Sequence, residues 1–135
     1  MEFIKLIYSN RSYCYKDASS IPMNILGRFL YSDIGCGEGE FFKSWALANK
    51  DDPASKFTYH IGANATLLEE EDDGYIYLYD TTERFSEKTW KQYLKISRHQ
   101  FVHLIDEWRE KVCKAKPKEV MIKYENDQFI IETKD

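Results

Sequence analysis

The sequence predicts an α+β fold in a single domain over residues 1–135, with a mainly antiparallel sheet of five or six strands and about three helices packed on it. Strand-like segments are grouped along the chain and do not alternate one for one with helices, which favours antiparallel pairing. The length of 135 residues suits one hydrophobic core and is short for two domains. No linker-like stretch interrupts the pattern, so we expect no domain boundary.

In the first third of the chain we expect two strands and two helices. Residues 2–8 are typical of a buried strand, and residues 13–16 extend it or pair with it after a turn. Apolar residues three and four apart then predict a helix over 20–32 that ends near Gly35, with Pro22 in its first turn. A second short helix fits residues 39–49.

The middle of the chain predicts mostly strands. Residues 56–61 favour a strand, and residues 64–70 and 74–80 favour two more. The last two meet at Asp72-Asp73-Gly74, and the Asp-Gly pair predicts a tight hairpin turn because both residues tolerate positive φ. A polar loop is expected over 81–90.

The last third predicts a strand, a helix and a hairpin. Residues 91–96 are a short strand candidate. Ser97 and Gln100 have the S-x-x-Q spacing of a capping box, and apolar residues follow at helical spacing until Pro117 ends the segment. The stretches EVMIKY and QFIIETK then form a hairpin about Asn126-Asp127.

Composition and charge narrow the function classes. Aromatic residues reach 16%, with ten Tyr and three Trp, so we expect some rings on the surface, where Tyr and Trp anchor protein interfaces. The net charge is −4, and the acidic excess lies in residues 1–90, with 9 Lys/Arg against 15 Asp/Glu. An acidic protein binds nucleic acid poorly, because phosphate contacts need Lys and Arg. It suits a basic protein partner.

The cysteines and the length of the apolar runs indicate the cellular compartment of the protein. Cys14, Cys36 and Cys113 are odd in number and widely spaced, without a CxxC motif, which predicts reduced thiols in a cytoplasmic protein. The N-terminal residues lack the basic and long apolar regions of a signal peptide. No apolar run approaches about 18 residues, so we expect no membrane segment and no membrane partner.

Two histidines are the first candidates for chemistry. His99 and His103 are four residues apart on the expected helix, the spacing of a metal-ligand pair, and Asp106 or Glu107 lies within a turn. However, the HExxH glutamate is missing and no spacing places a third and fourth ligand. Solvated or interface histidines are therefore the favoured interpretation, and we expect no metal and no cofactor.

The glycine-rich stretch GCGEGE at 35–40 is a second candidate. It precedes a helix as a phosphate loop does, but Glu38 and Glu40 would repel phosphate and the GK[ST] ending is absent. Cys36 lies in this stretch with no histidine near in sequence to activate it. A simple loop between two helices is the favoured interpretation.

A run of acids followed by alternating tyrosines is the third candidate. Adjacent carboxylates at an exposed turn stay ionised, which disfavours acid–base catalysis, and the calcium-loop spacing is missing. A strand alternates its faces, so the tyrosines share one face, which either packs under a helix or meets solvent. If exposed, rings beside acids would attract and hold a basic partner. The residues concerned are Glu69, Glu70, Glu71, Asp72, Asp73, Tyr75, Tyr77 and Tyr79.

Several features together resemble the small immunity proteins of bacterial toxin–immunity systems, including those of contact-dependent growth inhibition. The resemblance covers the length, the acidity and the aromatic-rich α+β layout, and the most similar stretches are FLYSDIG at 29–35, DEWREKVCKAKPKEV at 106–120 and the final hairpin. It implies a cytoplasmic protein that binds the C-terminal domain of one cognate toxin, a basic domain and a nuclease (RNase or tRNase), without catalysis of its own.

The predicted function is therefore that of a stoichiometric inhibitor and not of an enzyme. Its predicted partner surface comprises the acid and tyrosine run together with three acids nearer the N-terminus, Asp33, Glu38 and Glu40. Two alternatives stay open: a small metal-dependent hydrolase that uses His99 and His103, and a protein-binding adaptor that does not inhibit.

Overall fold

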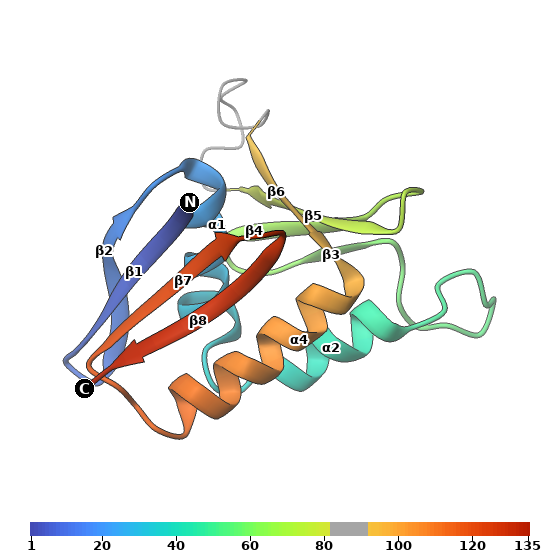
Figure 1. Cartoon of the computed structure of the whole chain (residues 1–135). Coiled ribbons are helices and arrows are strands. Elements are labelled where there is room, and N and C mark those ends of the chain that lie inside the picture. Colours follow the sequence, from blue (N-terminus) through green and yellow to red (C-terminus); the bar gives the residue numbers. More distant parts are fainter. Residues whose placement is uncertain (82–91) are drawn as a thin grey trace.

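The computed structural model describes residues 1–81 and 92–135 and forms two four-stranded antiparallel sheets with helices between them (Figure 1). Sheet A has the strand order β2-β1-β7-β8, and sheet B has the order β3-β4-β5-β6. The α+β class and the three α-helices are confirmed within these ranges. The single sheet of five or six strands is corrected to eight strands in two sheets. The reason is that the first and last hairpins of the chain pair with each other and not with the middle strands.

Sheet A is built from these two terminal hairpins. Its strands are β1 (Glu2–Ser9), β2 (Ser12–Ala18), β7 (Glu119–Glu125) and β8 (Gln128–Lys134). Both hairpin turns have positive φ at two consecutive residues, Asn10 (52°) and Arg11 (70°) in one, Asn126 (53°) and Asp127 (61°) in the other. Two consecutive residues with positive φ give a turn whose backbone twist has the same hand as the twist of the two strands that it joins. The central pair is β1 with β7, so that Ile4 lies opposite Ile122.

Sheet B comes from the middle of the chain. Its strands are β3 (His60–Gly62), β4 (Thr66–Glu70), β5 (Tyr75–Asp80) and β6 (Tyr93–Ser97). The predicted β4–β5 hairpin is confirmed, but only Gly74 has positive φ, at 81°, so the turn is a three-residue loop and not a two-residue one. Almost all of the polar loop expected over 81–90 lies outside the described residues.

The first helix begins at a capping serine. Ser20 precedes α1 (Ile21–Arg28), and its hydroxyl accepts a hydrogen bond from the Met23 N–H at 3.3 Å. The helix continues into a π-helical segment, η1 (Phe29–Ile34), and a turn then leads into α2 (Gly39–Leu47).

The capping box predicted for the last helix is half formed. The Ser97 hydroxyl accepts the Gln100 N–H at 3.1 Å, at the start of α4 (Arg98–Trp108). The Gln100 side-chain amide does not return to Ser97. It donates instead to the Asp127 carbonyl at 2.6 Å and so ties α4 to the β7–β8 turn. After Trp108 the helix continues as the π-helical segment η2 (Arg109–Cys113).

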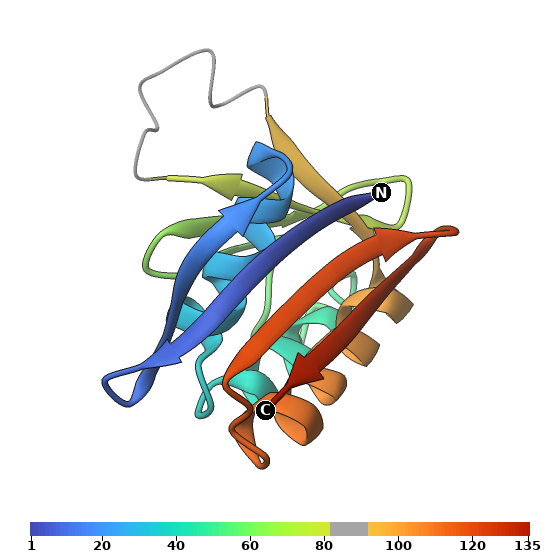
Figure 2. The ribbon, with the colours of Figure 1, turned by 60° about the vertical axis from the view of Figure 1, so that its left-hand side comes forward.

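One core joins the two sheets. Helices α1 and α4 contact strands of both sheets, and α2 packs on α4. In Figure 2, sheet A faces the viewer and the helices lie behind it. Helix α1 approaches β1 so closely that a Cβ on Gly27 would lie 2.2 Å from Ile4 Cδ1, so only glycine fits there. No helix in the described part of the chain combines the length and apolar character needed to cross a bilayer.

The expectation of three reduced thiols is corrected by a disulfide between Cys36 and Cys113, whose Cα atoms are 5.7 Å apart. The π-helical end of α4 lies beside the loop before α2, and the Trp108 indole N–H donates to the Gly35 carbonyl at 3.0 Å. The two cysteines are 77 residues apart in sequence, so no local spacing rule detects them. Cys14 is a free, exposed thiol.

Candidate functional site

The outer side of sheet B carries a group of tyrosines. Strand β5 alternates, so Ile76 and Leu78 are fully buried in the core, whereas Tyr75 on the other side is 38% exposed. Among the described helices, α1 and α4 contact β5 and β6 of this sheet, where Ile76 and Leu78 are buried. We call this outer surface the tyrosine face, and it comprises Tyr75, Tyr77, Tyr79, Tyr93, Lys95, Glu69, Glu71 and Asp73.

Neighbouring strands bring the rings together. Tyr93 on β6 pairs with Tyr79 on β5, and their ring centroids lie 5.8 Å apart. The Tyr93 ring is also 5.1 Å from that of Tyr77 and is itself 41% exposed. The rings therefore form a continuous ladder across two strands, with apolar edges and hydroxyl groups presented together.

A lysine lies within this ladder. Lys95 Nζ is 4.4 Å from the Tyr75 ring centroid and 5.7 Å from that of Tyr77, and it is 3.5 Å from Asp73 Oδ2. Asp73 also accepts the Tyr77 hydroxyl at 2.7 Å and the Tyr75 N–H at 2.9 Å. These hydrogen bonds, the first above all, lower the pKa of Asp73, so it stays ionised and holds Tyr77 in place.

Two acids on the tyrosine face repel each other. A hydrogen bond shared with Glu69 raises the pKa of Glu71, and the charges of Glu69, Asp72 and Asp73 raise it further. Burial, followed by the charges of Glu69 and Glu71, raises the pKa of Tyr79 to about 12. His60 Nδ1 lies 3.2 Å from Glu69 Oε1. A positive group from outside would relieve this repulsion.

Glu70 lies on the opposite side of β4 from Glu69 and is not part of this face. Its side chain is only 6% exposed and contacts Lys50 Nζ at 3.2 Å and an Arg98 nitrogen at 2.9 Å. Lys50 is itself fully buried and lies over the Trp45 ring at 4.8 Å. Glu70 therefore connects the segment after α2 to the start of α4, and its contacts are internal.

The other predicted partner residues are separated in space. Asp72 is exposed at the tip of the β4–β5 turn. Asp33 is buried in η1, where it accepts hydrogen bonds from the Thr66 hydroxyl at 2.6 Å and the Ala65 N–H at 3.3 Å. Glu38 and Glu40 are exposed at the start of α2, and Glu40 is paired with Arg109 and Lys43. The structure thus joins Glu69, Glu71 and Asp73 to the tyrosines and places Asp33, Glu38 and Glu40 elsewhere.

Sequence reasoning missed several members of this surface. Tyr93 and Lys95 could have been found from the alternation in KQYLKI, once β6 was paired with β5. Two further acids, Asp51 and Asp52, are exposed in the loop that follows α2. Asp51 accepts the Tyr59 hydroxyl, and this hydrogen bond is the main cause of the raised pKa of Tyr59, to which Asp72 also contributes. This loop therefore adds charge near the acidic end of sheet B.

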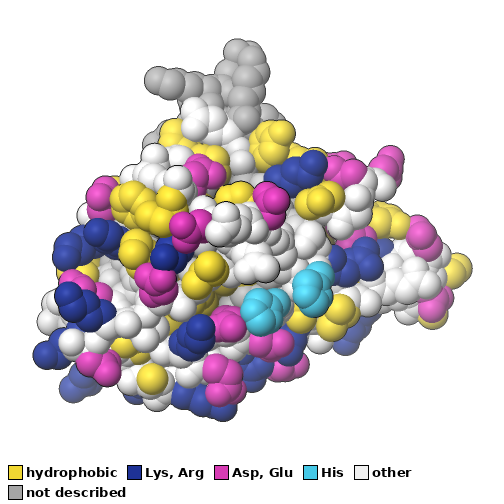
Figure 3. Space-filling model, viewed as in Figure 1, with side chains coloured by type: hydrophobic (Ala, Val, Ile, Leu, Met, Phe, Trp, Pro, Cys, Tyr) yellow, Lys and Arg dark blue, Asp and Glu magenta, His cyan; other side chains and the backbone are white. Residues whose placement is uncertain are grey.

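The histidine pair is exposed on α4. The rings of His99 and His103 stack with centroids 6.5 Å apart, and two histidines lie side by side in Figure 3. His103 Nε2 lies 3.3 Å from Glu107 Oε1, and Lys111 contacts the same carboxylate at 2.7 Å. Among residues 1–81 and 92–135, no cluster of three or more His, Cys, Asp or Glu is placed to hold a metal ion.

Comparisons with family models, curated proteins and solved structures find no match for this chain. The geometry described above is therefore the basis for any functional conclusion.

Proposed function

We propose that the protein is a stoichiometric inhibitor, an immunity protein that binds a basic bacterial toxin domain through the tyrosine face. The observation that carries this proposal is the combination, on the outer side of sheet B, of four tyrosines with an excess of acids. Tyrosines provide large contact areas at low entropic cost and are enriched at binding hot spots. The acids supply charge complementarity.

The two residue types have separate roles in the proposed complex. Glu71 and Asp72, exposed at one end of the face, attract the basic domain and speed the encounter. Tyr77 and Tyr93 are then buried against the partner and slow its release. A nuclease cleft is built to hold phosphates, so a carboxylate-rich surface occupies it in place of the substrate. This role needs neither a cofactor nor catalysis.

The first experiment is co-purification with the product of the neighbouring reading frame, followed by association kinetics at several salt concentrations. The double variant Glu71→Lys and Asp72→Lys should associate about tenfold more slowly and with weaker salt dependence. The matched control is Asp17→Lys with Glu125→Lys, which makes the same charge change on exposed residues of sheet A. Equal association rates for the two double variants would contradict the proposed role of the acids.

An activity assay separates inhibition from simple binding. The purified toxin domain should lose its activity at a one-to-one ratio with this protein. A tight complex in which the toxin stays fully active would instead identify the protein as an adaptor that uses the same face.

A further inference from the structure

Among the described strands, β3 lies at one edge of sheet B. Its three residues pair with β4 alone, with His60 opposite Glu69 and Gly62 opposite Leu67. The bonds that flank the strand run from the Glu70 N–H to the Tyr59 carbonyl (2.9 Å) and from the Ala63 N–H to the Thr66 carbonyl (2.8 Å). Antiparallel hydrogen bonds use every second residue, so the N–H and C=O groups of His60 and Gly62 point away from β4. The His60 carbonyl accepts the Thr58 hydroxyl at 3.0 Å and keeps one further lone pair for a partner.

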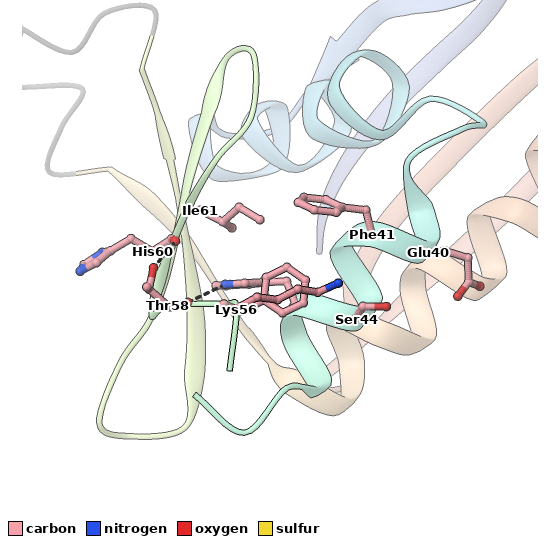
Figure 4. A pocket seen from close by; sticks show the side chains of 9 residues that line it. Glu40, Phe41, Ser44, Lys56, Thr58, His60 and Ile61 are labelled. Atoms are coloured by element: carbon pink, nitrogen blue, oxygen red, sulfur yellow. Dashed lines mark hydrogen bonds between the residues drawn. The ribbon is translucent and has the colours of Figure 1, made fainter. Parts of the chain in front are cut away.

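A hollow of about 530 Å³ lies beside this edge, on the inner side of the sheet. Its apolar walls are Phe41 and Trp45 from α2 and Phe57 and Ile61 from the segment that forms β3. Glu40, Ser44, Lys56, Thr58 and His60 complete the lining. Figure 4 shows Ile61 and Phe41 facing each other across the space, whereas His60 points away from it. Phe41 is 46% exposed at the mouth, so the apolar lining can be reached from outside.

The charges near the edge indicate which kind of segment fits. His60 points to the outer side of the sheet and contacts Glu69, and Glu71 follows on the same side. The exposed acids Asp51 and Asp52 lie in the loop that leads to β3. A strand added to β3 would turn alternate side chains toward these acids and the others toward the hollow.

We infer that the edge of β3 binds an extended segment of a basic protein, which pairs with His60 and Gly62 and inserts an apolar side chain between β3 and α2. The outward side chains of the segment are Lys or Arg, which face Glu69 and Glu71. The backbone hydrogen bonds supply affinity without sequence preference, and the hollow selects an aromatic or large aliphatic side chain. The inference rests on the proposed function for the identity of the partner, but the binding site can be tested without any toxin.

The probe is a synthetic peptide of alternating Lys and Phe, titrated into isotope-labelled protein and followed by NMR. We expect the largest shifts at the amides of His60 and Gly62 and in the residues around Phe41. A second peptide with the same side chains, but with methylated backbone nitrogens at alternate positions, cannot donate to the edge and should bind at least tenfold more weakly. Equal binding of both peptides, or no binding at millimolar concentration, would overturn the inference.

A pair of variants on α2 tests the hollow itself. Ser44 is exposed and lines the hollow, so Ser44→Trp should fill it and weaken peptide binding by at least tenfold. Leu47 is 61% exposed on the same helix outside the lining, so Leu47→Trp is the matched control and should bind normally. Unchanged binding by Ser44→Trp, or shifts confined to Tyr75–Tyr79, would overturn the inference. Either result would leave the toxin-binding test of the tyrosine face unaffected.

Discussion

The outer faces of the two sheets differ in how their charges are satisfied. The strands of sheet A carry four Lys and five Asp/Glu, whereas the tyrosine face of sheet B carries Lys95 against Glu69, Glu71 and Asp73. On sheet A, Lys16 pairs with Glu119 at 3.3 Å and Lys123 with Glu132 at 2.5 Å. Figure 3 shows positive and negative side chains intermixed over these strands.

The comparison shows that sheet architecture does not decide which surface is available for binding. Both sheets are four-stranded and antiparallel, and both turn an apolar inner side toward the same helices. The charges of the sheet A strands are nearly balanced, and Lys16 and Lys123 each pair with a glutamate of a neighbouring strand. Sheet B leaves an excess of acids beside exposed rings, and that imbalance is the physical basis of the proposed interface.

The largest expected effect is on the sheet A side, at the Cys36–Cys113 disulfide. It closes a loop of 77 residues, so reduction should lower the free energy of unfolding by about 4 kcal/mol. Urea denaturation with and without reductant measures this, and Cys14→Ser should show the same dependence on reductant. Reduced protein that stays folded should still bind through the tyrosine face. An unchanged urea midpoint would mean that the disulfide does not form in solution.

The next largest effect separates two adjacent acids of β4. Glu70→Ala leaves the fully buried Lys50 without its carboxylate and should cost about 3 kcal/mol of stability. Glu69→Ala, on the outer side, should change stability little. Thermal or urea unfolding of both variants measures the difference. Similar losses for the two would mean that β4 does not divide its acids between an inner and an outer side.

A pair of tyrosine variants compares one exposed tyrosine from each sheet. Tyr77→Ala should speed release of the toxin domain and cost about 2 kcal/mol, roughly thirtyfold in affinity. Tyr15, on β2 of sheet A, is 50% exposed, and Tyr15→Ala should leave binding unchanged. Dissociation rates measure the effect, and melting curves show whether either variant is destabilised. Equal binding losses for the two variants would remove the distinction between the sheets.

The smallest effect concerns Tyr13 on sheet A, whose hydroxyl donates to the Pro117 carbonyl at 2.5 Å. Burial is the main cause that raises the pKa of Tyr13 from 10.0 to about 12. Tyr13 therefore loses its proton at a lower pH in the unfolded chain than in the folded protein. Its contribution to the free energy of unfolding is fully present below pH 10 and is lost as the pH rises from 10 to 12.

Tyr13→Phe should lower the free energy of unfolding by about 1 kcal/mol at neutral pH. The difference in unfolding free energy between variant and wild type should narrow above pH 10. Urea unfolding across pH measures the gap, and a spectrophotometric titration gives the tyrosine pKa values. A gap that widens with pH would show that Tyr13 ionises more easily in the folded state.

Local sequence patterns predicted the helices and strands well, but they predicted poorly how the strands pair into sheets. The alternation over residues 74–80 placed Tyr75, Tyr77 and Tyr79 on one side, and the structure has them there. The strand count failed because the pairing of β1 with β7 depends on contacts between the two ends of the chain, which periodicity does not contain.

The acid run shows the same limit within the candidate site. Adjacent acids in sequence look alike, but the strand period sends Glu69 outward and Glu70 inward to Lys50. Asp33 looked like a surface acid because nothing local in the sequence reveals that Thr66 and Ala65 meet it. Short-range rules therefore found the tyrosines and could not tell which acids accompany them.

The central position of β1 in sheet A also has a consequence for synthesis of the chain. Leu6 is fully buried and lies opposite Val120, so the first hairpin cannot complete its sheet until β7 has been translated. At ribosomal speeds that interval is on the order of ten seconds. The strands of sheet B lie between residues 60 and 97 and leave the ribosome earlier. Ile4 and Leu6 are then the apolar side chains that a chaperone would shield during this wait.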